Sequence, residues 1–332
     1  MSRRLFALIP ALLGALIASI VALGGPVAAQ QNKRVIIGVS PSSDTALLIV
    51  AVNGGFLTKQ GVDAQLKVFD SSPQALQALV ARQADVSMQT EPPQLATRAK
   101  GGKVVQVMTG WISSRNAAGV VAGKVIAKPE DFVGKTVATQ RGSGANYHMV
   151  TFLANHRIPL DKVTIRYMAA PDQIPALARG DVQAFFSWEP YASRGAQSVP
   201  DAKILTWAQD DGIEFRDNVV MREDFAKDDK DTAVRVVKGL IATADWMQAN
   251  PREASKIANS VLRAPTEEDV YRDLLIFKYP GDFRKGLIEH ERRIAEWAIS
   301  MGLFEASDPQ KLVQELIYPD IIKVAAPDRT DM

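Results

Sequence analysis

The chain has 332 residues, more than a single compact core usually contains, so two lobes are expected. Hydrophobic residues make up 47% and charged residues 23% of the chain, which is an ordinary globular composition and excludes a disordered or fibrous protein. The chain has no cysteine, which excludes disulfides, thiolate catalysis, iron–sulfur clusters, cysteine-based zinc sites and a cysteine-linked lipid anchor.

Residues 1–29 have the three-part organisation of an export signal. Arg3 and Arg4 precede an apolar stretch over residues 5–23, and small residues suited to cleavage come directly before Gln30. We therefore predict a signal peptide, rather than an uncleaved anchor, and localisation in the periplasm. Two export routes stay open, because the arginine pair fits both the general Sec pathway and the twin-arginine pathway.

The charge of the chain without its signal peptide is close to balanced. Removing residues 1–29 takes away two arginines and no acids, which leaves 37 basic and 37 acidic residues. This balance gives no reason to expect a nucleic acid as partner. No later segment is long and apolar enough to span a bilayer.

The first part of the chain alternates between β-rich runs and helical patterns. Strands are predicted at residues 35–39, 64–70, 86–88 and 104–109, with helices at 47–51, 73–81 and 92–100. Such alternation is typical of βαβ units, and it predicts a mostly parallel sheet.

The same order of elements then starts again. Strands are predicted at 133–139, 163–168 and 182–187, with helices at 145–156 and 172–178. The segment VDAQLKVFDSSPQALQALVARQADVSMQTEPPQ matches LDKVTIRYMAAPDQIPALARGDVQAFFSWEPYA in order, and Glu91-Pro92 corresponds to Glu189-Pro190. An internal duplication with two similar α/β lobes is therefore expected.

After about residue 222 the patterns become helical. Helices are predicted at 232–247, 252–261, 267–277, 287–301 and 309–317. We assign residues 30–114 and 220–332 to the first lobe, with the C-terminal helices, and residues 115–219 to the second lobe. The segments 115–123 and 215–221 are the predicted hinge crossings between the lobes.

Four segments together resemble a known family. They are LLIVAVNGGFLTKQGVDAQL, ALQALVARQADV, KPEDFVGKTVATQRGS and ALARGDVQAFFSWEPYA. In this order they resemble the periplasmic solute-binding proteins of ABC importers of the aliphatic-sulfonate, taurine and nitrate type, a group that shares its fold with thiamine-pyrimidine synthases. The resemblance implies a type II periplasmic-binding-protein fold, with two Rossmann-like lobes joined by two crossings and the solute bound between them.

Ligands of open α/β sheets bind beyond the carboxyl ends of the strands, so the residues that follow each predicted strand are the candidate binding residues. The candidates in the first lobe are Ser42, Ser43, Asp44, Gln89, Thr90, Glu91, Trp111 and Ser114. The second lobe contributes Arg141, Ser143, Gly144, Ala145, Trp188 and Glu189. Helix starts at two of these segments favour an oxyanion.

Each of these residues also has a purely structural interpretation. A serine before a helix can simply cap it, and Trp188 or Trp111 can pack in the core. Glu91 and Glu189 can pair with an arginine instead of a ligand. If the duplication places both glutamates in the cleft, they favour a ligand that combines an ammonium group with an anionic group, such as an amino-sulfonate.

Catalysis has little support in the sequence. No nucleophile elbow, phosphate loop or zinc-binding His-Glu-x-x-His motif is present, and no metal or cofactor is expected. The expected function is therefore that of a monomeric binding protein, not an enzyme, which passes a small organic anion or zwitterion to an inner-membrane ABC permease. Two alternatives stay open: an enzyme of the thiamine-pyrimidine-synthase group, and a solute-binding module for a sensor or another class of transporter.

Overall fold

The structure is a computed structural model that describes residues 34–113, 117–262 and 266–332. The predicted signal peptide, residues 1–29, lies outside the described residues, and so does the candidate binding residue Ser114. The chain divides into two units at Lys33, and the folded part described here is the second, Arg34–Met332.

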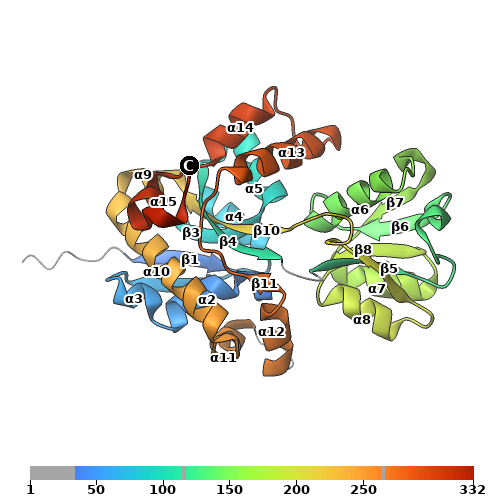
Figure 1. Ribbon diagram of the computed structural model, residues 1–332, viewed down its shortest axis with the longest axis horizontal. Helices are drawn as coiled ribbons and strands as arrows, with labels where there is room; N and C mark the ends of the chain where they lie inside the picture. The colour runs from blue at the N-terminus through green and yellow to red at the C-terminus, as the bar shows by residue number, and fades with distance from the viewer. Residues whose placement is uncertain (1–33, 114–116, 263–265) are drawn as a thin grey trace, which may run out of the picture. The chain divides into compact units, whose positions relative to one another are not determined.

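Six strands form the first sheet, in the order β11-β4-β10-β3-β1-β2 (Figure 1). The strands are β1 (Val35–Val39), β2 (Ala64–Val68), β3 (Val86–Thr90), β4 (Val104–Ser113), β10 (Arg216–Arg222) and β11 (Phe277–Lys278). β1 pairs in parallel with β2 and β3, whereas β10 is antiparallel to both of its neighbours, β3 and β4. The run of Val and Ile that predicted a buried strand at residues 35–39 forms β1, which lies between β3 and β2.

Five strands form the second sheet, in the order β7-β6-β8-β5-β9. They are β5 (Ala118–Ala122), β6 (Thr136–Thr139), β7 (Thr164–Tyr167), β8 (Ala184–Trp188) and β9 (Lys203–Trp207). In both sheets three parallel strands are followed by an antiparallel one: β2-β1-β3 by β10, and β7-β6-β8 by β5. The two sheets therefore share the order and direction of these four strands, as the predicted duplication requires.

The strands that we predicted in each lobe run in the same direction, as expected, and both sheets are mixed because each also contains an inserted antiparallel strand. The chain leaves the first sheet after β4, enters the second as β5, and returns from β9 to the first as β10. Each entering strand is inserted between two others and runs antiparallel to them. The ranges that we predicted as crossings, 115–123 and 215–221, consequently contain strands β5 and β10, and the return segment is the preceding stretch, 208–215.

Short helices connect the strands of the two sheets. Those of the first sheet are the 3-10 helix Ser43–Thr45, α2 (Ala46–Asn53), α3 (Phe56–Lys59), α4 (Ser72–Val80) and α5 (Glu91–Ala99). Those of the second are the 3-10 helices Pro129–Phe132 and Leu160–Lys162, with α6 (Gly144–Asn155), α7 (Ala170–Arg179) and α8 (Tyr191–Ser198).

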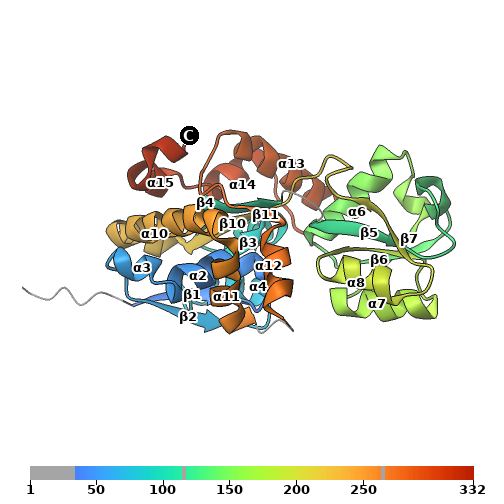
Figure 2. The ribbon, with the colours of Figure 1, turned by 60° about the horizontal axis from the view of Figure 1, so that its bottom comes forward.

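The C-terminal part is helical, as predicted, and packs on the first sheet. Its helices are α9 (Glu223–Asp228), α10 (Lys230–Ala249), α11 (Pro251–Leu262), α12 (Glu267–Leu274), α13 (Gly286–Ser300), α14 (Pro309–Leu316) and α15 (Asp320–Ala325), followed by the 3-10 helix Pro327–Arg329. α10 runs beside α2, and α13 and α14 pack on α5 (Figures 1 and 2). The predicted helix 267–277 ends at Leu274 in the structure, and its last predicted residue, Phe277, belongs to strand β11.

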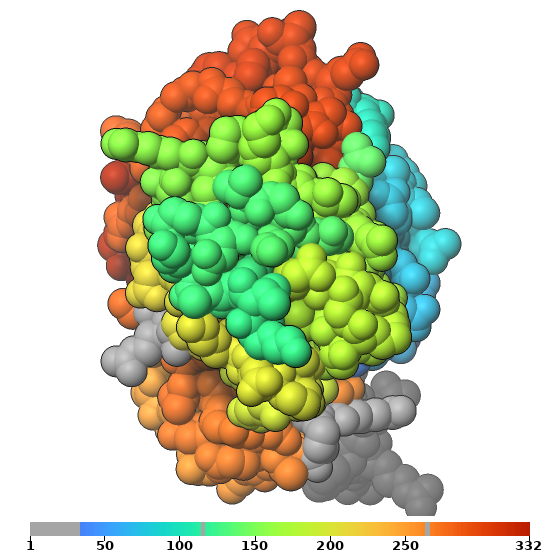
Figure 3. Space-filling view, turned by 90° about the vertical axis from the view of Figure 1, so that its right-hand side faces the viewer, coloured from blue at the N-terminus to red at the C-terminus, as the bar shows by residue number. Residues whose placement is uncertain are grey.

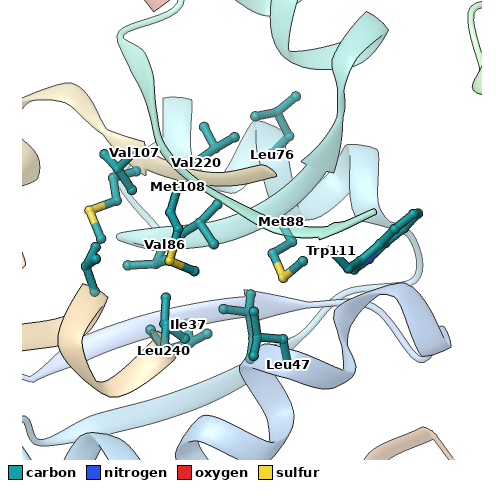
Figure 4. Packing of buried hydrophobic residues seen from close by; sticks show 14 of the residues in the cluster. Ile37, Leu47, Leu76, Val86, Met88, Val107, Met108, Trp111, Val220 and Leu240 are labelled. Carbon is teal, nitrogen blue, oxygen red and sulfur yellow. The ribbon is translucent and has the colours of Figure 1, made fainter. Parts of the chain in front are cut away.

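The core of the first sheet consists of aliphatic and methionine side chains from both faces. Figure 4 shows Met88 and Met108 packed with Ile37, Leu47 and other buried residues, with Trp111 at the side of this cluster. Burial of each large apolar side chain of this kind contributes about 1.5–3 kcal/mol. This core fixes the strand ends that hold the candidate binding residues.

The second sheet has aromatic cores of its own. Phe152 and Phe186 pack edge-on to the ring of buried His148, and Phe132 packs tilted on both of these phenylalanines. The Nε2 atom of His148 lies 2.8 Å from the Asp211 carboxylate, which ties α6 to the return segment 208–215. Figure 3 looks onto this part of the chain, whose surface is coloured green to yellow.

Neither a membrane span nor a metal cluster is found among residues 34–113, 117–262 and 266–332. No helix there combines the length and the apolar character that crossing a bilayer requires. No three His, Asp or Glu side chains there are grouped in a way that could hold a metal ion.

Candidate functional site

A cavity of about 1380 Å³ lies where segments following strands of both sheets meet. The first sheet contributes the residues that follow β1, β2 and β3, and the second contributes those that follow β6 and β8. The side chains of α12 and β11, from the C-terminal part, complete the lining. The position agrees with the rule that α/β sheets bind ligands beyond the carboxyl ends of their strands.

Most of the predicted binding residues line this cavity. They are Ser42, Ser43, Gln89, Thr90, Trp111, Arg141, Ser143, Gly144, Ala145, Trp188 and Glu189. The structure thus brings together residues that are up to 147 positions apart in the chain, from Ser42 to Glu189. Their contact with a ligand stays a prediction.

Glu91 does not line the cavity, contrary to our expectation. Its side chain is only 3% exposed, and one carboxylate oxygen lies 2.9 Å from Nε2 of His290 on α13. Glu91 is the first residue of α5, and α13 packs against that helix, so its side chain finds a partner away from the cavity. The duplication therefore does not give Glu91 and Glu189 equivalent surroundings.

Glu189 lines the cavity and is held by the first turn of α8. Its carboxylate accepts hydrogen bonds from the backbone N–H and the hydroxyl of Ser193, at 3.1 and 2.5 Å. Burial raises the pKa of Glu189, and the hydrogen bonds from Ser193 work in the opposite direction. The hydrogen bonds fix the orientation of a carboxylate that has no arginine partner within ion-pair distance in the described chain.

The side chains after β1 are arranged around carboxylates rather than around an anion site. The hydroxyl of Ser43 donates to Asp273 on α12 at 2.7 Å, and Ser72 donates to the Asp44 carboxylate at 3.1 Å. Burial raises the pKa of Asp44, and the hydrogen bond from Ser72 works in the opposite direction. Our expectation that Ser43 donates to an oxyanion is therefore not supported, because its hydroxyl already donates a hydrogen bond to Asp273.

The start of α6 is the more suitable place for an anion. Ser143 caps the helix by accepting a hydrogen bond from the Asn146 N–H, and its own hydroxyl donates to the Gln140 carbonyl at 2.7 Å. Gly144 and Ala145 are the first two residues of this twelve-residue helix, and N–H groups at these positions have no intrahelical acceptor. Both line the cavity, so the backbone rather than the Ser143 hydroxyl is placed to donate to an anion.

Gly144 also allows a close contact with the return segment. A Cβ atom at this position would lie 2.8 Å from Cε1 of Phe215. Phe215 therefore packs directly on the backbone at the start of α6, and it also lines the cavity. Any larger residue at position 144 must push this ring away.

We expect Gly144→Ala to destabilise the protein by about 1–3 kcal/mol, because the added methyl group overpacks the contact with Phe215. Gly286→Ala is the matched control, since Gly286 begins α13 and no atom lies within 4 Å of an added Cβ. Chemical denaturation of both variants measures the difference. Equal unfolding midpoints for the two variants would contradict the proposed packing.

Aromatic residues supply the apolar part of the cavity. Trp111 is 5% exposed and stacks on Phe277 with ring centroids 4.2 Å apart, and its Nε1 donates to the backbone carbonyl of Asp44 at 2.9 Å. Trp188 lies at the end of β8, edge-on to Tyr191 at 6.1 Å. Trp111 therefore belongs both to the core and to the cavity, which resolves the two interpretations that the sequence left open.

The sequence reasoning missed the part of the lining that comes from the C-terminal helices. Asp273 and Phe277 lie on α12 and β11, more than 150 positions from the nearest predicted first-lobe residue. They sit in a segment with a plain amphipathic pattern and follow no parallel strand. No signal in a single sequence distinguishes them from other residues of a packed helix. No histidine lines the cavity, as far as the described chain is concerned.

Known proteins share this architecture. The chain is 26% identical over 238 residues to the taurine-binding periplasmic protein of Escherichia coli (strain K12), covering 69% of this chain and 73% of that protein. The structure matches the alkanesulfonate-binding protein SsuA from Xanthomonas axonopodis pv. citri, solved with MOPS bound, with a TM-score of 0.70 and 20% identity over 86% of this chain and 98% of that one.

The fold class is confirmed by a further match. The Candida albicans CA3427 gene product, described as having the generic periplasmic binding protein structural fold, gives a TM-score of 0.66 at 14% identity, over 86% of this chain and 96% of that one. The sequence model of the NMT1/THI5-like family matches residues 42–254. Because this match covers more than half of the chain, the chain belongs to the NMT1/THI5-like family.

Proposed function

We propose that this protein is the periplasmic binding component of an ABC importer, and that it captures a small organic anion or zwitterion of the sulfonate or taurine type. The observation that carries the proposal is the cavity of about 1380 Å³, lined by the segments that follow strands of both sheets. Relatives named for taurine and alkanesulfonate binding support the same class of ligand.

The lining suits binding of such a ligand without reaction. The N–H groups at the start of α6 can hold an anionic head group, and Trp111, Trp188 and Phe277 can cover an apolar chain. Several polar side chains of the cavity hydrogen-bond one another, as Glu189 does with Ser193 and Ser43 with Asp273. We therefore propose that the protein acts as a carrier that passes the unchanged solute to a permease.

We expect the correct solute to raise the melting temperature of the purified protein, because a ligand that binds only the folded state stabilises it. The gain is about 2.7 kcal/mol when the free ligand is at a hundred times its Kd. A thermal-shift series with taurine, ethanesulfonate and nitrate measures it, and mass spectrometry of the recovered solute tests for turnover. Steady conversion of the solute would contradict the carrier function and favour an enzyme.

A further inference from the structure

The charged side chains that line the cavity are distributed unevenly between its two sides. The elements packed with the first sheet contribute Asp44, Asp70, Asp269, Asp273 and Arg272. The elements of the second sheet contribute Arg141, Arg194 and Glu189. The only ion pair among these side chains, in the described part of the chain, joins Asp269 to Arg272 on α12. We refer to the two groups as the acidic side and the basic side.

On the acidic side, two partly buried carboxylates lack a cationic partner. Neither Asp44 nor Asp273 forms an ion pair with a described residue, and each accepts a hydrogen bond from a serine hydroxyl. One oxygen of Asp44 is buried and has no hydrogen-bond partner, although the residue lines the cavity. Buried acceptors of this kind are normally satisfied, so this oxygen points to a donor that the chain itself does not supply.

A third acidic side chain, that of Asp217, lies on β10 next to residues of the cavity. Asp217 is 0% exposed, and neither of its oxygens has a hydrogen-bond partner. Its cross-strand neighbours, Thr90 on β3 and Trp111 on β4, both line the cavity. Residues directly opposite each other on paired strands point to the same face of the sheet, so the Asp217 carboxyl lies on the face that borders the cavity, where a cationic nitrogen would favour its ionised form. Packing alone gives no reason for an unpartnered carboxyl at this position.

The basic side carries two arginines that lack an anionic partner among the described residues. Arg141 and Arg194 form no ion pair with any described residue, and Arg141 lies over the ring of Tyr167 at 5.4 Å. The start of α6, with the free N–H groups of Gly144 and Ala145, belongs to the same side. Burial raises the pKa of Glu189, and so does the charge of nearby Asp273, so the one acid of this side lies close to the acidic side.

We propose that the ligand is a zwitterion held in one orientation, with its cationic nitrogen against Asp44 and Asp273 and its anionic group against Arg141 and the start of α6. This inference rests on the proposed function and narrows its ligand class. A plain anion would satisfy the basic side alone and would leave the unpartnered oxygen of Asp44 without a donor. A cationic nitrogen supplies that donor and offsets the excess of carboxylates.

The test compares ligands that differ only in the nitrogen. Taurine and β-alanine are zwitterions, and ethanesulfonate and propionate are the same anions without the amino group. Calorimetry on the full mature chain should show taurine binding at least tenfold more tightly than ethanesulfonate, or β-alanine at least tenfold more tightly than propionate. Asp44→Asn and Asp273→Asn should each weaken the zwitterion about 10- to 100-fold and leave the plain anion unharmed.

Two control variants separate this orientation from a simple effect of net charge. Asp161→Asn makes the same change in charge at a side chain that is 73% exposed and outside the cavity, and it should not alter either affinity. Arg141→Gln should weaken the zwitterion and the plain anion alike. Circular dichroism of each variant establishes that it is folded before its affinity is measured.

The possible outcomes distinguish the two proposals. If ethanesulfonate binds as tightly as taurine, or if Asp44→Asn and Asp273→Asn weaken both ligands equally, the orientation is overturned and sulfonate capture stands. If β-alanine binds and neither sulfonate does, the zwitterion site is supported and the sulfonate class is wrong. If none of the four ligands binds, both proposals are overturned.

Discussion

Trp111→Ala should reduce the free energy of unfolding by about 3–5 kcal/mol, one of the largest effects of a single substitution in this chain. The indole is almost fully buried, stacks on Phe277 and packs beside the methionine core of the first sheet. Its removal leaves a cavity that the neighbouring strands cannot fill. It also removes the hydrogen bond that fixes the backbone of Asp44.

A more conservative variant separates packing from hydrogen bonding at this position. Trp111→Phe keeps an aromatic ring against Phe277 and loses the N–H that donates to the Asp44 carbonyl at 2.9 Å. We expect it to cost about 1 kcal/mol for the hydrogen bond, in addition to the smaller loss of buried area. The free energy of solute binding should change by more than the free energy of unfolding, because Asp44 lines the cavity.

Trp246→Ala is the matched control for both variants. Trp246 packs against Phe56 with ring centroids 5.4 Å apart, is only partly buried and does not line the cavity. It should lower the stability less than Trp111→Ala does and leave solute affinity unchanged. Urea denaturation followed by far-UV circular dichroism, together with calorimetry, measures both quantities. Loss of solute affinity in Trp246→Ala, with Trp111→Phe unaffected, would show that Trp111 has no special role.

The sequence predicted the parts of the site that follow a repeating local pattern. Strand, turn and helix recur in order, so the positions of Thr90, Ser143 and Trp188, at or just after the ends of strands β3, β6 and β8, could be inferred from one sequence. The antiparallel insertion of β10 could not, because its direction is determined by the crossing between the sheets and not by its own residues. The predicted strands therefore run in the expected direction, whereas the antiparallel strand between β3 and β4 was missed.

The partners of the charged residues were also beyond the reach of the sequence. Glu91 and Glu189 occupy matching places before a proline, yet one pairs with His290 from the C-terminal part and the other lines the cavity. Likewise, Ser43 donates to Asp273, 230 positions away along the chain. Local pattern places a residue at the end of a strand, whereas packing between distant segments decides which way its side chain turns.

Asp217→Asn should raise the free energy of unfolding at pH 8 by about 1–3 kcal/mol, because it removes a buried carboxyl that has no partner. Burial raises the pKa of Asp217 well above its usual range, and the charges of Asp44 and Glu91 add to this effect. The folded state therefore holds the proton to higher pH than the unfolded state does. As the pH rises above 3.8, the unfolded chain is stabilised by ionisation and the folded chain is not.

The stability of the wild type should fall relative to that of Asp217→Asn as the pH rises. The contribution of Asp217 to stability is fully present below the pKa of an unfolded aspartate and is lost as the pH rises toward the raised folded-state pKa. Asn cannot ionise, so the variant and the wild type should have similar stability at pH 4 and should diverge as the pH increases. Urea denaturation at a series of pH values measures this difference, with Asp161→Asn, at an exposed position, as the control.

Asp217 lowers the stability of the protein at neutral pH, and its position beside the acidic side of the cavity suits a role in ligand binding. In Asp217→Asn the ligand-free protein should melt at a higher temperature, while the further rise produced by taurine should be smaller than in the wild type. The two changes have one cause. Burial makes ionisation of the Asp217 carboxyl unfavourable in the empty protein, and a cationic nitrogen bound nearby offsets that cost. An unchanged response to taurine would mean that Asp217 does not act on the ligand.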